Sequence, residues 1–392
     1  MTVTKQQLES NIWKFYLTRI ELLAFISPIV AIYLLSKGLS LTQVFTLQAF
    51  FGIMIASLEL PTGAISDLIG RKYTLFLSSV SLTIALFVYG FIGKDFMTFL
   101  LAEFFIALGL TLLSGTDSAF VYDTLRKLKK TDEYKRIFSN GHSVKLVTSS
   151  VIVAISGILS SISFDLMFLV ATSVGVLVTL SHLLLVEPPY KRAGFSASKY
   201  ISQMKTNVVF TFTHKRVRWL TMFSGIFGTM MLLCFWYYQP YMKAVNLDLV
   251  YFGFAFSGMN LTAAIASKLT VKFENKFGEL LSLIIITALP LISLFLMGTV
   301  FATAMVLAIY LQQISRGFNN PLITAYINDH LKHTNRATVL SMSGLISRLG
   351  AFIVLPVFGY LIDAWSLAQS MLFAGVMFSI IFLIAFLVKP KD

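Results

Sequence analysis

The sequence predicts an all-α membrane protein with twelve transmembrane helices in two pseudo-symmetric six-helix bundles. Hydrophobic residues make up 57% of the 392-residue chain and charged residues only 12%, whereas soluble chains are about a quarter charged. The chain divides into about twelve apolar runs, and one long polar stretch separates them into two sets of six. A soluble fold would need more polar surface than this composition supplies.

Each apolar run is long enough to cross a bilayer, which takes about 20 residues of helix. In chain order the expected spans are 15–36, 41–66, 73–93, 96–122, 144–163, 164–186, 219–242, 249–271, 280–299, 301–327, 337–362 and 366–388. The polar N-terminus lacks the small-residue cleavage site of a signal peptide, so the first run is expected to stay as a helix.

The basic residues predict the orientation. With the N-terminus inside, 24 of the 31 Lys and Arg fall on the inner side, and only Lys37, Lys94 and Lys243 fall outside. The other four lie within apolar runs. Under the positive-inside rule, both termini are expected in the cytoplasm. The net charge of +13 therefore reflects topology, and no nucleic-acid partner is expected.

The polar stretch predicts the domain boundaries. Residues 1–187 are expected to form the first bundle, 188–215 a cytoplasmic linker and 216–392 the second bundle. The halves also resemble each other, since DLIGRK follows the second span where FENKFG follows the eighth. Twofold repeats of this kind are common in secondary transporters, whose sites lie between the halves near the midplane.

The loop after the second span carries a motif. Gly63, Asp67, Gly70, Arg71 and Lys72 stand at the spacing GxxxDxxGRK. Asp67 and Arg71 are one helical turn apart and can pair if the helix continues that far. Glycine at the other two positions lets a helix end or turn approach another backbone closely.

This motif, with the topology and the six-linker-six plan, resembles the major facilitator superfamily over the whole chain. The resemblance implies two six-helix bundles that rock around a central site. It also implies a charge relay between Asp67, Arg71 and an acid at the inner end of the fourth helix, here Asp123. Gly63, Asp67, Gly70, Arg71 and Asp123 are thus expected to act as a cytoplasmic latch. The segments around 114–123 and 336–341 are similar to bacterial efflux-type members.

Two features depart from the drug/proton antiporters of that superfamily. Their fifth helix usually carries a Gly-Pro-x-x-Gly-Gly pattern, but here the fifth run has Gly157 and no proline. Their fourth helix often carries an arginine, but here the nearest basic residue, Arg126, follows the span. Both departures disfavour proton-driven drug efflux and leave the fold prediction unchanged.

Arg19, Lys145, Arg316 and Arg348 lie within expected spans, where charge is costly and usually functional. Arg19 and Lys145 stand near span ends, so each can either extend to the interface or act inside the membrane. Arg316 and Arg348 have more than ten span residues on both sides, which favours substrate contact.

The acidic residues Glu21, Glu59, Glu103 and Asp117 also lie within expected spans and are the proton-coupling candidates. The resemblance implies that helices one, four, seven and ten line the cavity, which favours Glu21, Glu103 and Asp117 as proton carriers. The alternative is internal pairing with Arg19 or Arg316, which would satisfy the charges without binding a ligand.

Polar and aromatic residues complete the expected substrate site. Gln312, Asn319 and Asn320 flank Arg316 in the tenth span, which is typical of a cavity wall. Tyr237 and Tyr238 in the seventh span either line the cavity or belong to an interfacial aromatic belt. The expected substrate contacts are therefore Arg19, Tyr237, Tyr238, Gln312, Arg316, Asn319, Asn320 and Arg348.

These residues predict a secondary active transporter that works by alternating access. The expected cargo is a small organic solute with a negative group, such as a carboxylate metabolite or siderophore, moved by proton coupling, with export favoured. The alternatives are multidrug efflux of amphipathic compounds, import of organic anions, and a non-transporting membrane receptor. No nucleophile–base set, P-loop or metal-ligand spacing among the five His predicts an enzyme, cofactor or metal site. A monomer in a bacterial inner membrane is expected.

Overall fold

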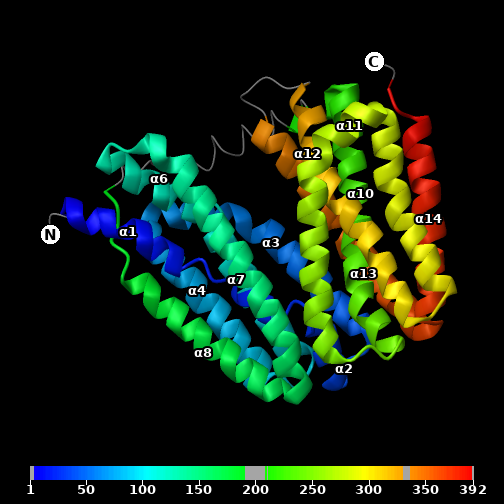
Figure 1. The fold of residues 1–392 in the computed structure, drawn as a ribbon, viewed down its shortest axis with the longest axis horizontal. Helices are drawn as coiled ribbons and strands as arrows, with labels where there is room; N and C mark the ends of the chain where they lie inside the picture. Colours follow the sequence, from blue (N-terminus) through cyan, green and yellow to red (C-terminus); the bar gives the residue numbers. More distant parts are fainter. Residues whose placement is uncertain (1–3, 190–207, 210, 330–335, 391–392) are drawn as a thin grey trace. The chain divides into compact units, whose positions relative to one another are not determined.

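The computed structural model describes residues 4–189, 208–209, 211–329 and 336–390, so most of the expected linker lies outside the described residues. The described part is almost entirely helical and contains no β-strand (Figure 1). It forms two compact units. The first comprises Met1–Tyr33, Phe50–Phe195 and Leu249–Phe254, and the second Leu34–Ala49, Ser196–Asp248 and Ala255–Asp392. Leu34–Ala49 therefore belongs to the second unit and Leu249–Phe254 to the first, unlike in the expected domains. The domain boundaries expected from the sequence stay a prediction.

The helices follow the order of the apolar runs. The first half contains α1 Lys5–Leu17, η1 Leu22–Phe25, α2 Val30–Ser36, α3 Leu41–Ile69, α4 Arg71–Phe87, η2 Val88–Ile92, α5 Phe96–Leu113, α6 Thr116–Leu128, η3 Thr131–Glu133, α7 Tyr134–Ile162 and α8 Phe164–Leu183. The second half contains α10 Lys215–Ala244, α11 Leu249–Thr299, η4 Thr303–Ala308, α12 Ile309–Asp329, α13 Arg336–Ala364 and α14 Leu367–Leu387.

The span count is consistent with twelve. Among the described residues, nine helical segments are long and apolar enough to cross a membrane, and the bent pair Lys5–Phe25 and Val30–Ser36 makes a tenth. The 51-residue α11 is about 76 Å long at 1.5 Å per residue, more than twice the hydrocarbon thickness. It bends at Gly278 (φ 67°), which divides it into the expected eighth and ninth spans. The 21-residue α12 supplies the remaining span.

Two expected spans are interrupted. The first is broken between α1 and α2, where the chain passes through η1, and the fourth is broken at Gly115 (φ 76°) between α5 and α6. A broken helix frees backbone polar groups, which hydrocarbon cannot satisfy. Such breaks are tolerated where protein or a water-filled cavity surrounds them, and polar side chains gather at both.

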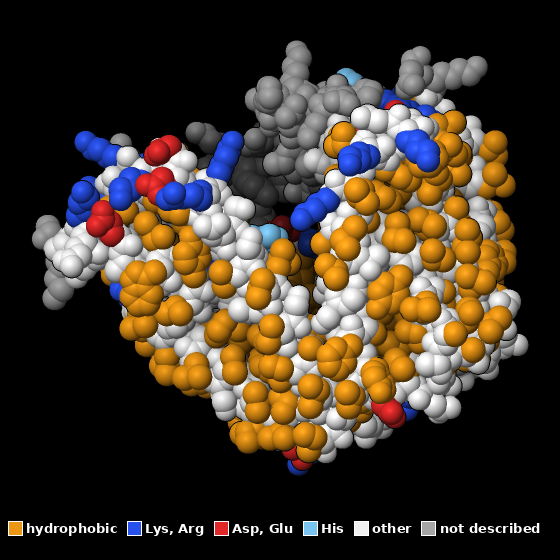
Figure 2. Space-filling model, in the orientation of Figure 1, with side chains coloured by type: hydrophobic (Ala, Val, Ile, Leu, Met, Phe, Trp, Pro, Cys, Tyr) orange, Lys and Arg blue, Asp and Glu red, His pale blue; other side chains and the backbone are white. Residues whose placement is uncertain are grey.

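The outer surfaces of both units are apolar. Exposed leucine, isoleucine, valine and phenylalanine side chains cover the flanks of each unit, and the Lys and Arg side chains gather at one end of each (Figure 2). In water, apolar surface of this extent would drive aggregation. It is the natural surface of a protein whose solvent is lipid.

Small residues let the helices of the first unit approach closely. α4 packs against both α5 and α8, as Figure 1 shows for α4 and α8. A Cβ added at Gly109 on α5 would lie 2.7 Å from Leu82 on α4, and one at Gly175 on α8 would lie 2.8 Å from Thr83. Close backbone packing of this kind drives helix association where no hydrophobic force acts between helices.

The second unit uses the same device between α10 and α13, its most extensive helix pair. A Cβ at Gly225 on α10 would lie 2.4 Å from Ile346, and one at Gly350 on α13 would lie 2.3 Å from Thr229. Thr229 Oγ1 also donates to the Ser347 carbonyl at 3.2 Å. The two helices therefore meet along a seam that has no room for larger side chains.

We expect Gly350→Ala to destabilise the protein by about 1–3 kcal/mol, because the new methyl group overlaps Thr229 on the neighbouring helix. Gly344→Ala is the matched control on the same helix, since a Cβ there meets open space and removing glycine favours the helix by up to about 1 kcal/mol. Thermal unfolding in detergent compares them. Equal midpoints for the two variants would contradict the close α10–α13 seam.

Candidate functional site

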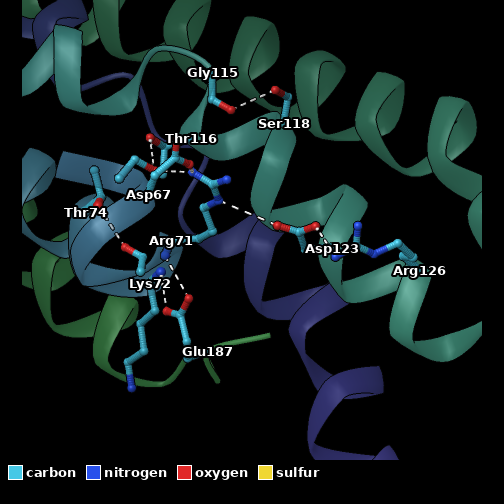
Figure 3. Close-up of polar contacts among 12 residues, drawn as sticks. Asp67, Arg71, Lys72, Thr74, Gly115, Thr116, Ser118, Asp123, Arg126 and Glu187 are labelled. Carbon is cyan, nitrogen blue, oxygen red and sulfur yellow. Dashed lines mark hydrogen bonds and ion pairs between the residues drawn. The ribbon is translucent and has the colours of Figure 1, made fainter. Parts of the chain in front are cut away.

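Arg71 lies between two carboxylates that belong to different helices. Its Nη1 is 2.8 Å from Asp67 Oδ1 at the end of α3, and its Nε is 3.6 Å from Asp123 Oδ2 on α6 (Figure 3). Nη1 also donates to Ser66 Oγ at 2.7 Å, and Arg126 approaches Asp123 at 3.1 Å. The structure thus brings together the three charged side chains of the expected latch. Their role as a latch stays a prediction.

The helix does not continue from Asp67 to Arg71. α3 ends at Ile69 and Gly70 has φ 105°, so the ion pair forms across a break. This φ lies in the left-handed region, where a side chain would be strained. At Gly70 a side chain approaches closely instead of the expected backbone, since a Cβ there would lie 2.8 Å from Glu187 Oε1. It is not met at Gly63, where a Cβ finds no heavy atom within 4 Å in the described part of the chain.

Glu187 is a site residue that the sequence reasoning missed. Its carboxylate accepts from the backbone N–H of Arg71 at 2.8 Å and of Lys72 at 2.7 Å, which caps the first turn of α4 (Figure 3). A carboxylate at a helix N-terminus also interacts favourably with the helix dipole. The only signal in the sequence was an acid just after the sixth span, near the expected domain boundary.

Burial raises the pKa of the Glu187 carboxyl, although the hydrogen bonds from the Lys72 and Arg71 amides act to lower it. The carboxyl therefore binds its proton more tightly in the folded protein than in the unfolded chain. Its contribution to stability is fully present below the ordinary pKa of 4.5 and is lost as the pH rises through the raised value.

Two ion pairs close the break in the first span. Arg19 Nη1 lies 2.7 Å from Asp117 Oδ2 in the first turn of α6, and Lys145 on α7 pairs with Glu21. Arg19 is only 8% exposed, so its charge is removed from solvent. Asp117 and Glu21 are therefore both paired with a cation inside the protein, as the alternative of internal pairing expected. Their role in proton transfer stays a prediction.

A cavity adjoins these pairs, and we call it the broken-span cavity. It encloses about 430 Å³ that no protein atom fills, part of it open to the outside. Arg19, Glu21, Lys145 and His182 are among its lining residues. The Arg19 Nε is buried and makes no hydrogen bond to any described residue. The cavity wall therefore carries two cations and at least one acid.

Glu103 lies apart from that cavity. It is 3% exposed and accepts a hydrogen bond from the Tyr89 hydroxyl. Tyr33 in turn donates to the Tyr89 carbonyl, and the rings of Phe99 and Phe168 pack around both tyrosines. This carboxyl is enclosed by an aromatic cluster in the first unit. Glu59, the remaining acid candidate, is exposed on α3.

In the second unit, Arg316 opens onto a pocket of about 1160 Å³, which includes open space. Asn320 and Thr324 on α12 and Ser267 on α11 also line it. The guanidinium Nη2 donates to Asn260 Oδ1 at 2.9 Å, and no carboxylate of the described residues forms an ion pair with it. An arginine with a neutral partner beside an open pocket is suited to bind an anion.

The other expected contacts in this unit divide into two groups. Tyr237, Tyr238 and Gln312 are buried, at about 1% exposed. The Tyr238 hydroxyl donates to Gln312 Oε1 at 2.6 Å and accepts from Gln313 Nε2 at 2.9 Å, and Tyr237 pairs with Ser370 at 2.7 Å. These side chains satisfy one another inside the unit. Asn319, whose Oδ1 is buried without a described partner, and Arg348 are half-buried.

Within the described residues, no group of three or more His, Cys, Asp or Glu side chains is arranged to hold a metal ion. His182 is buried beside the broken-span cavity, and its Nδ1 lies 2.8 Å from the Val178 carbonyl. The sequence reasoning noted it as a single polar residue, and only the fold places it near Arg19.

Comparison with known proteins identifies the fold. A family model described as Major Facilitator Superfamily matches residues 22–276 and 219–392. An uncharacterised MFS-type transporter, YxaM of Bacillus subtilis (strain 168), is 24% identical over 380 residues, which cover 93% of this chain and 92% of that protein.

Solved structures are similar over nearly the whole chain. The nucleoside transporter NupG has a TM-score of 0.80 at 14% identity, covering 99% of both chains. A bacterial homologue of the lysosomal transporter Spinster has a TM-score of 0.75 at 15% identity, covering 98% of this chain and 96% of the other. A POT family transporter in complex with 5-aminolevulinic acid has a TM-score of 0.74 at 16% identity, covering 98% of this chain and 96% of the other. These likenesses concern the fold alone.

We expect Glu187→Ala to lower stability by about 1–3 kcal/mol, because two backbone N–H groups at the start of α4 lose their acceptor. Glu187→Gln keeps one acceptor and removes the cost of burying a charge, so its loss should be smaller. Relative to Glu187→Gln, the native protein should lose stability as the pH rises from about 4.5 through the raised pKa of Glu187.

Thermal unfolding in detergent across this pH range measures all three proteins. Glu133→Gln serves as control, because Glu133 pairs with the exposed Arg136 three residues along the chain and such surface pairs contribute little to stability. If Glu187→Ala unfolds at the native midpoint, the carboxylate does not stabilise the start of α4.

Proposed function

The chain belongs to the major facilitator superfamily, and from this premise we propose that it is a secondary active transporter that moves a small organic solute with an anionic group. Alternating access, proton coupling and export are parts of the same proposal. Export rests on the resemblance to efflux-type members around 114–123 and 336–341. The expected orientation, with both termini in the cytoplasm of a bacterial cell, rests on the positive-inside rule.

The observation that carries the proposal is the environment of Arg316. Arg316 lines an open pocket whose other lining residues are uncharged, and its guanidinium donates a hydrogen bond to the amide oxygen of Asn260. A permanently charged group without a described carboxylate partner is costly within a spanning helix. A solute carboxylate or phosphate would supply the missing counter-charge through a bidentate contact.

Proton coupling is supported by the pairs at the broken first span. Glu21 and Asp117 each hold a cation, Lys145 and Arg19. Protonation of either acid would release its cation, and a released cation changes which conformation is favoured. Glu103 is a further candidate, since its buried carboxyl donates or accepts a hydrogen bond with Tyr89 according to its protonation state.

A zwitterion is a second candidate solute, favoured by the same pairs. Arg19 pairs with Asp117 and Lys145 pairs with Glu21, so the two pairs together are electrically balanced. A site of this kind suits a solute that carries both a carboxylate and an ammonium group. One solved neighbour, a POT family transporter, was crystallised with 5-aminolevulinic acid, which carries both.

We expect Arg316→Gln to weaken binding of the anionic solute about 10- to 100-fold, because one charge-assisted contact contributes about 1.5–3 kcal/mol. Arg316→Lys should lose less. Binding is followed by thermal shift across matched carboxylates, amines and amino acids, and transport by uptake into liposomes under a proton gradient. Lys243→Gln, in the last turn of α10, is the control. A shift only with amines would contradict the anion site.

We expect Asp67→Asn to slow transport while leaving solute binding nearly unchanged, because Asp67 contacts Arg71 at the helix break and not the Arg316 pocket. Initial uptake rates and equilibrium binding are measured on the same preparation. Lost binding would show that Asp67 belongs to the solute site rather than to the latch.

A further inference from the structure

An apolar groove runs between α10 and α14 in the second unit, at the end where α10 begins and α14 ends. It offers about 560 Å³ free of protein atoms, including open space. Its lining side chains are all apolar, with Phe223 and Ile226 from α10 and Ile381 and Ile384 from α14. The transport proposal makes no use of this groove.

The side chains at the base of the groove are buried and well packed, whereas those at its edge are exposed. Trp219 Nε1 donates to the Ala385 carbonyl at 2.7 Å, which ties α10 to α14. Phe223 is 1% exposed and packs edge-on against Phe382. In contrast, Ile384 is 54% exposed and Val388 is 63% exposed. The opening therefore faces outward, where α10 and α14 meet lipid.

Cations gather where the groove ends. The Arg216 guanidinium lies 5.4 Å from the centre of the Trp219 ring, and Lys389 Nζ lies 6.0 Å from it. Lys215 and Arg218 are exposed on either side of Arg216. Glu279 pairs with both Arg216 and Lys389, so this one carboxylate leaves an excess of positive charge.

We propose that this groove binds an anionic phospholipid, with one acyl chain along the apolar floor and the phosphate at Lys389 and the first turn of α10. The charge and the apolar groove support this occupant together. A free phosphate would make no use of the groove, and a neutral lipid would make no use of the cations. Basic pockets beside spanning helices are a recurring form of lipid recognition at the cytoplasmic leaflet. The orientation expected from the charge count puts this end in that leaflet.

Native mass spectrometry of the delipidated protein tests the site. The protein is incubated with phosphatidylglycerol or phosphatidylcholine of the same acyl chains, and bound lipid is counted. We expect tighter retention of phosphatidylglycerol. Lys389→Gln and Lys215→Gln should each weaken it about five-fold while leaving phosphatidylcholine unchanged. Lys243→Gln, far along α10 from this end, should change neither.

A second variant separates the groove from the charge. Met222→Trp adds bulk to a lining position that is 39% exposed and leaves every cation in place. We expect Met222→Trp to reduce retention of phosphatidylglycerol. Its thermal unfolding midpoint should equal that of the control variant Lys243→Gln. Equal retention of both lipids by the native protein would overturn the proposal, as would full retention by Met222→Trp. Competition by glycerol phosphate as effective as that by the whole lipid would also overturn it, since the groove would then contribute nothing.

Discussion

The rest of the structure depends on one constraint, which is that a backbone N–H or carbonyl in hydrocarbon must find a hydrogen-bond partner within the protein. For this reason the described chain is almost entirely helical, and each break in a helix needs other protein groups to satisfy the freed backbone N–H and carbonyl groups. The chain leaves helical geometry after α1, at Gly70, at Gly115 and at Gly278. Charged residues lie close to each of these points, so the breaks locate most of the polar chemistry.

Two of the breaks have similar architecture in the two halves. α4 begins after Gly70, and Glu187 from beyond the sixth helix contacts its first turn. The later part of α11 begins after Gly278, and Lys389 from beyond α14 contacts Glu279 at 3.5 Å. In each half, a residue a few positions beyond the last helix contacts the start of the third span. The charges of these residues are opposite, since Glu187 is acidic in the first half and Lys389 is basic in the second.

Much of the fold followed from the sequence because hydrophobic runs and loop charges are local signals. The expected eighth and ninth spans appear as one helix with a kink at Gly278, and the expected tenth span is helical although Gln312, Arg316 and Asn320 make it polar. The first span is different. A run of apolar residues predicts a continuous helix, but the chain leaves helical geometry after Leu17 and bends before α2, where Pro28 is a local helix breaker. Only the tertiary structure shows that α6 and α7 supply Asp117 and Lys145 as partners for Arg19 and Glu21 beside this break.

The candidate site was only partly within reach of the sequence. By itself the sequence determined the membrane class and the spacing of Asp67 and Arg71, because these depend on composition and on a local motif. The meeting of both residues with Asp123 was implied by the family resemblance. Only the tertiary structure decided that Tyr237, Tyr238 and Gln312 satisfy one another, that Arg316 keeps a neutral partner beside an open pocket, and that Glu187 caps α4. The physical reason is that the state of a buried polar group depends on which partner reaches it, and those partners come from helices far away in the chain.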